Sequence, residues 1–98
     1  MKIQLEERLK DYMKENNFKN IIITSMVCHT WGGSRLEVSA RFVDEAESNV
    51  LRNDHFEEMK HELGSAFIRR IPQKTEEVVT LGLSRFIKRI TVNGIYSA

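Results

Sequence analysis

Apolar residues recur at helical spacing in the first segment of the chain. Within residues 3–16, Leu5, Leu9, Tyr12 and Met13 stand at positions i, i+4, i+7 and i+8, which lie on one face of an α-helix. Most of the other residues in this segment are charged. The pattern predicts an amphipathic helix that packs its apolar stripe on a flat partner.

Two β-prone runs follow, residues 20–31 and 34–44, separated by Gly32 and Gly33. Two glycines favour a two-residue hairpin loop, because the turns that close such hairpins need positive φ angles. With this loop, one face carries the pairs Ile23–Phe42, Ser25–Ala40, Val27–Val38 and His29–Leu36. The other face carries Thr24–Arg41, Met26–Ser39, Cys28–Glu37 and Thr30–Arg35. The first face holds the apolar residues of both strands, so we expect it to lie on the core.

The middle of the chain predicts a second helix. Residues 44–53 are polar and are interpreted as a connection, and Asp54 then begins a pattern similar to a capping box. An apolar stripe at helical spacing supports a helix over residues 54–70: Phe56, Met59, Leu63 and Phe67. Gly64 inside this helix predicts a kink or a close packing contact, and Pro72 limits its end.

The last segment fits two patterns. Residues 77–83 predict a strand, whereas residues 84–93 match either a helical face or the continuation of a strand. We favour a third strand that is long and bulged near Gly82, and we expect residues 93–98 to form a flexible tail.

These elements predict an α+β fold in which residues 1–98 form one domain. The order helix, β-hairpin, helix, strand gives a three-stranded, mainly antiparallel sheet with helices on one face. Over residues 3–83 this order resembles the type II KH fold and the small ribosome-associated factors built on it. The resemblance implies nucleic-acid binding, but the Gly-x-x-Gly loop of KH domains is absent, since the chain offers only Gly64-Ser65-Ala66-Phe67.

Composition narrows the class of protein. Of the 98 residues, 41% are hydrophobic and 30% are charged, which suits a single soluble domain. The apolar runs fall far short of the ~20 residues that cross a bilayer, and the first residues do not form a signal peptide. Cys28 is the only cysteine, so we expect a cytoplasmic protein without an internal disulfide and without membrane association.

The residues that could support catalysis or metal binding are poorly placed for either. Cys28 and His29 are neighbours on a strand and point to opposite faces, while His55 and His61 are six residues apart on the predicted helix. Glu37 beside Cys28 should raise the pKa of the thiol and so suppress its nucleophilicity. His29 faces Leu36 and is interpreted as a buried or half-buried structural histidine. We therefore expect no enzymatic activity, no metal and no cofactor.

Two groups of residues are candidates for binding. Trp31 lies at the mouth of the hairpin turn, where it either stays exposed as an interaction anchor or folds back over the first helix to cap the core. The outer hairpin face is more apolar than solvent exposure requires, because it carries Met26, Cys28, Ile22 and Val43. This indicates a protein partner, a homodimer or an unexpected element of the chain that covers it. Residues 64–98 hold six Lys or Arg and two Glu, and the basic candidates are Arg69, Arg70, Arg85, Lys88 and Arg89. These cations either merge into one patch or form part of an ordinary mixed surface.

The sequence thus favours a small binding module over an enzyme. The preferred hypothesis is a protein-binding adaptor, regulator or inhibitor that acts through the hairpin face, including a regulator encoded by a phage or mobile element. The alternative is an RNA-binding or ribosome-associated factor that uses the basic C-terminal residues. A protein partner is favoured over nucleic acid.

Overall fold

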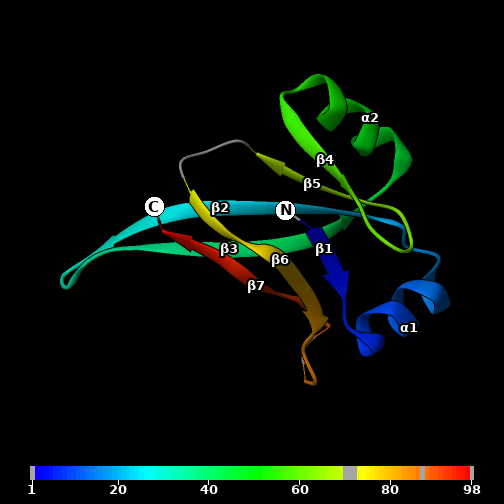
Figure 1. The fold of residues 1–98 in the computed structure, drawn as a ribbon, viewed down its shortest axis with the longest axis horizontal. Helices are drawn as coiled ribbons and strands as arrows, with labels where there is room; N and C mark the ends of the chain where they lie inside the picture. The colour runs from blue at the N-terminus through cyan, green and yellow to red at the C-terminus, as the bar shows by residue number, and fades with distance from the viewer. Residues whose placement is uncertain (1, 70–72, 87, 98) are drawn as a thin grey trace.

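The computed structural model describes residues 2–69, 73–86 and 88–97. In these residues the chain forms two α-helices and seven β-strands, arranged as two mixed sheets (Figure 1). In chain order the elements are β1 (Lys2–Leu5), α1 (Glu7–Asn16), β2 (Asn20–Thr30), β3 (Gly33–Val43), α2 (Glu45–Asn53), β4 (Phe56–Lys60), β5 (Ser65–Arg69), β6 (Gln73–Leu83) and β7 (Ile90–Ser97). The described part is α+β, and neither of its helices has the length and apolar character needed to span a membrane.

The smaller sheet has the strand order β1-β6-β7 and the larger sheet has the order β3-β2-β5-β4. β1 runs parallel to β6, and β6 runs antiparallel to β7. In the larger sheet β2 pairs antiparallel with β3 and parallel with β5, and β5 pairs antiparallel with β4. β3 and β7 lie side by side where the two sheets meet (Figure 1). The predicted three-stranded, mainly antiparallel sheet is therefore matched only in part, since the described residues form a four-stranded sheet as well.

Successive residues of β2 point into two different hydrophobic clusters. Ile21 and Ile23 belong to the larger cluster, which joins the two sheets and takes in residues of α1. Ile22, between them, belongs to a smaller cluster with Phe67 of β5 and Leu51 of α2. Because alternate residues of a strand point to opposite faces, α1 and α2 cover opposite faces of the larger sheet. The prediction that both helices lie on one face is wrong.

The first predicted helix is confirmed from Glu7 onward, where α1 buries its stripe against the larger cluster. Ile3 and Leu5 belong instead to β1. They are buried while Lys2 and Gln4 between them are exposed, which is the period of two expected for a strand. The helical spacing of Leu5 with the residues after it concealed this short alternation.

The hairpin is confirmed, but its loop lies one residue earlier than predicted. Thr30 pairs with Gly33, so the loop is Trp31-Gly32, and of the two glycines only Gly33 has a positive φ, at 121°. The pairing therefore shifts by two residues, and Ile23 lies opposite Ala40. A shift by two residues keeps every side chain on its face, so the predicted inner and outer faces are correct.

The predicted helix over residues 54–70 is wrong, because this segment forms the β4–β5 hairpin. Ser65 to Ile68 are all buried, which marks a strand covered on both faces. Gly64 does make the close contact that the sequence predicts, since a β-carbon there would overlap the backbone carbonyl of Lys19. The second helix is instead α2, within the predicted polar connection, and its N-cap Asp44 accepts a hydrogen bond of 2.8 Å from the backbone N–H of Glu47.

The C-terminal segment is a β-hairpin. β6 confirms the strand predicted over residues 77–83, and the irregularity in its pairing lies between Thr75 and Thr80, not near Gly82. The described residues between Leu83 and Ile90 belong to neither a helix nor a strand, and β7 then begins. Residues 93–97, predicted as a tail, belong to β7, where Ile95 is buried in the larger cluster. The type II KH order is thus matched only in part, since β1 precedes α1 and the β4–β5 hairpin replaces the long helix.

Candidate functional site

The β2–β3 hairpin is much longer than the core that supports it. β5 pairs with β2 only from Asn20 to Ile23, whereas β2 continues to Thr30. In Figure 1 the two strands run on together past the other elements and end in a free turn. We call residues 26–36 the distal hairpin.

The distal hairpin exposes apolar side chains on both faces. Met26 on the outer face is 66% exposed, and Val27 on the inner face is 54% exposed. Trp31 in the turn is 108% exposed, so it does not fold back over the first helix. Of the two interpretations of Trp31 from sequence, the exposed one holds.

The outer face also carries a small polar cluster. Arg35 donates a hydrogen bond of 2.6 Å to the Glu37 carboxylate, which lowers the pKa of Glu37. The Cys28 thiol donates a hydrogen bond to the same carboxylate, and this bond raises the pKa of Cys28 as the sequence predicts. The thiol is therefore held in its poorly nucleophilic, protonated form.

The histidines are dispersed. His29 is exposed and its Nδ1 lies 3.0 Å from Ser34 Oγ. Its predicted burial is therefore wrong, because no described residue covers the inner face at this position. His61 lies in the β4–β5 turn, where its Nδ1 accepts hydrogen bonds of 3.1 Å from the backbone N–H groups of Leu63 and Gly64. Across residues 2–69, 73–86 and 88–97, no three His, Cys, Asp or Glu side chains are grouped as a metal site requires.

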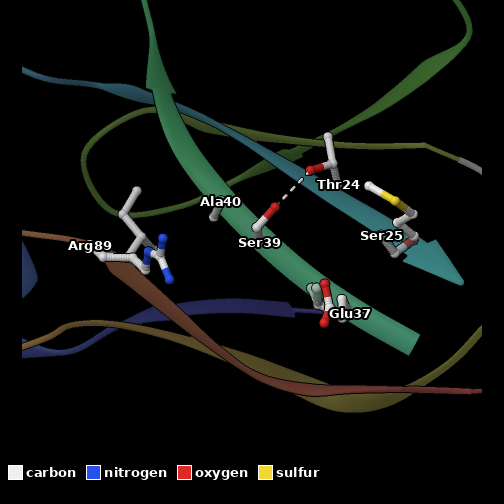
Figure 2. Close-up of a pocket in the computed structure, with 9 residues that line it drawn as sticks. Thr24, Ser25, Glu37, Ser39, Ala40 and Arg89 are labelled. Atoms are coloured by element: carbon white, nitrogen blue, oxygen red, sulfur yellow. Dashed lines mark hydrogen bonds between the residues drawn. The ribbon is translucent and has the colours of Figure 1, made fainter. Parts of the chain in front are cut away.

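At the base of the distal hairpin, a hollow of about 600 Å³ adjoins β3. Thr24 and Ser39 share a hydrogen bond of 3.0 Å on one side of this strand. Figure 2 shows Arg89 on the other side, beside Ala40. The hollow is therefore lined by polar as well as apolar residues, and it carries both a cation, Arg89, and a carboxylate, Glu37.

The predicted basic residues fall into separate places. Arg69 ends β5, with its guanidinium carbon 5.2 Å from the centre of the Phe56 ring. Arg85, Lys88 and Arg89 are exposed in the connection between β6 and β7. The end of β5 and this connection lie apart in Figure 1, and Arg70 is outside the described residues. The predicted cations thus do not gather into one patch among the described residues.

Sequence reasoning missed one exposed aromatic residue. Phe86 is 97% exposed in the β6–β7 connection, although its spacing from Ile90 placed it on an apolar stripe. The signal was present in the neighbouring residues, because Phe86 is surrounded in sequence by Ser84, Arg85 and Lys88.

No family model, curated protein or solved structure matches this chain.

Proposed function

We propose that the protein is a non-enzymatic, cytoplasmic protein-binding module that acts as an adaptor, regulator or inhibitor through its distal hairpin. The observation that supports this most is Trp31, fully exposed at the tip of a ribbon whose two faces also expose Met26 and Val27. Tryptophan is the residue most enriched among binding hot spots. Exposed apolar groups on a projecting element mark an interaction surface, and a two-stranded ribbon gains stability when a partner covers it.

The edge of β2 supports the same proposal. Along residues 26–30, no described strand pairs with the side of β2 that faces β5 in the proximal part of the hairpin. β2 carries no charged residue along its eleven positions, whereas proteins commonly protect an open strand edge with charges or proline. This edge offers backbone groups to an extended segment of a partner, while Trp31 supplies an anchor.

Site-specific photocrosslinking tests the proposal in cells. A benzophenone amino acid at position 31 should crosslink to one protein, because the tip contacts the partner directly. The matched control places the same group at Val50, which is also exposed but lies on α2. A crosslink to a second copy of the chain identifies a homodimer, whereas a crosslink to RNA, or equal yields at positions 31 and 50, contradicts the proposal.

Affinity measurements with the captured partner then test the role of each residue. Trp31→Ala should weaken binding by about 30-fold or more, the loss expected for a hot spot. Raising the salt concentration should change the affinity little, since the contact is mainly apolar. Unchanged affinity in Trp31→Ala, with the fold retained by circular dichroism, would show that the tip is not the binding site.

A further inference from the structure

The connection between β6 and β7 combines cations with an exposed ring. We call the described residues of this connection, 84–86 and 88–89, the basic turn. It is closed by a hydrogen bond of 2.9 Å from the backbone N–H of Ser84 to the carbonyl of Arg89. Between these residues the Phe86 ring is 97% exposed, and Arg85 and Lys88 are exposed beside it. From residue 78 to residue 98 the sequence contains no Asp or Glu. The carboxylates that share a hollow with these cations come from other elements, Asp11 and Glu15 of α1 with Lys88 and Glu37 of β3 with Arg89.

Two of the cations have defined positions. The Lys88 Nζ lies 5.5 Å from the centre of the Tyr12 ring of α1. This cation–π contact holds the ammonium group of Lys88 against α1. Arg89 lines the hollow of about 600 Å³ next to β3, across this strand from Thr24 and Ser39 (Figure 2). The turn thus carries cations before and after an exposed aromatic residue in the sequence.

We infer that the basic turn is a binding site for single-stranded nucleic acid, separate from the protein-binding tip of the hairpin. Phe86 stacks against one base, while Arg85, Lys88 and Arg89 contact the phosphates on either side of it. The adjacent hollow accommodates a neighbouring nucleotide on the side of β3 that carries Arg89 and Ala40. The exposed ring favours a nucleic acid over an acidic peptide, which offers no base to stack.

Fluorescence anisotropy with labelled U12 and dT12 tests the inference on the full chain. Both oligonucleotides offer phosphates and bases, and a difference between them shows whether the 2′-hydroxyl contributes. With about three phosphates neutralised, affinity should fall by roughly 20-fold between 50 and 200 mM salt. Anisotropy that does not change with U12 or dT12 at 50 mM salt would overturn the inference.

Charge variants locate the site. Arg85→Glu with Arg89→Glu should reduce affinity to the limit of detection. The control, Lys14→Glu with Lys19→Glu, changes net charge equally at exposed positions in and just after the last turn of α1, and it should bind at near the original strength. Equal losses in the two double variants would reveal general attraction and overturn the site.

Variants of the ring separate stacking from charge. Phe86→Leu should weaken binding about tenfold, whereas Phe86→Trp should retain it, because only an aromatic ring stacks on a base. Trp31→Ala should leave oligonucleotide binding unchanged, so this site and the hairpin site can fail independently. Full affinity in Phe86→Leu, or binding of polyglutamate or anionic phospholipid vesicles as tight as that of U12 at the same salt, would overturn the inference.

Discussion

The two ends of the β2–β3 hairpin differ more than their sequences suggest. At the proximal end, Ile22 and Ile23 are buried on opposite faces, in the two hydrophobic clusters. At the distal end, Met26 and Val27 of the same strand are both largely exposed. The difference along β2 arises from its neighbours, because the described pairs with β5 and the cluster with Leu51 of α2 lie at the proximal end. Stability therefore resides mainly in the proximal end, and the distal end is available for binding.

The largest effect is predicted for the free energy of unfolding, in a comparison of two positions on one face of β2. Ile23→Ala should lower the free energy of unfolding by about 2–5 kcal/mol, because Ile23 is buried in the larger cluster and its truncation leaves a cavity. Val27→Ala, four residues further along, should cost less than about 0.5 kcal/mol because its side chain is already in water. Urea unfolding followed by circular dichroism measures both values. Similar losses of stability at the two positions would contradict the conclusion that the proximal end of the hairpin contributes most of the stability.

Sequence alone predicted the faces of the hairpin, but not which part of it is buried and which is exposed. The alternation of apolar residues assigned the inner and outer faces correctly, and an error of two residues in register left them unchanged. The exposure of Val27 could not be predicted, because it depends on where β5 ends and not on any residue of β2. The burial expected for His29 was wrong for the same reason.

The elements that cover the proximal end were the hardest to predict. The spacing of Phe56, Met59 and Phe67 matches a helix, yet Ser65–Arg69 is a strand because it lies between β2 and β4 and is covered on both faces. Periodicity cannot separate a short buried strand from a buried helix. In contrast, the N-terminus of α2 had a recognisable signal, since Asp44 caps the helix and Glu47 stands three residues later.

The candidate binding residues were predicted unevenly. Trp31 was identified from its place beside the glycine turn, and its exposure follows from the projection of the hairpin. Phe86 was missed because its segment, residues 84–93, was interpreted as a helical face or a continued strand. Whether a loop aromatic is buried depends on tertiary contacts that local pattern does not contain.

A second prediction concerns the elements that hold the proximal end. Glu58 of β4 accepts hydrogen bonds from Arg52 of α2, Ser65 of β5 and Lys60, which lower its pKa to about 2. Since the folded pKa lies below the ordinary value of 4.5, this stabilisation is present above pH 4.5 and is lost as the pH falls towards about 2. Glu58→Gln should lower stability at pH 7 by about 1 kcal/mol.

Urea unfolding of the wild type and Glu58→Gln at a series of pH values tests this. The difference between the two proteins should shrink below pH 4.5 and vanish near pH 2. A difference that stays constant across this range would mean that the charge of Glu58 does not support the β4–β5 hairpin.

A smaller effect is expected from His61, in the turn of the same hairpin. Burial lowers the pKa of His61 below 6.5, and its Nδ1 already accepts two backbone hydrogen bonds that a second proton would displace. The unfolded chain takes up a proton near pH 6.5 before the folded chain does, so stability should fall as the pH decreases from 7.5 to 5.5. His61→Asn keeps an acceptor but does not titrate, and its stability should depend less on pH in this window. An identical pH dependence in the variant would assign the effect to other groups.

The smallest effect is predicted at the distal end, where Glu37 should control the reactivity of the Cys28 thiol. Cys28 is partly exposed, and its hydrogen bond to Glu37 raises the pKa of the thiol. Glu37→Gln removes the charge, so the thiolate fraction at pH 8 should rise and alkylation by iodoacetamide should accelerate several-fold. Mass spectrometry of timed samples gives both rates. If shielding rather than charge limits the reaction, the two proteins will react at the same rate, and the distal hairpin would then be more enclosed than the exposure of Met26 and Val27 indicates.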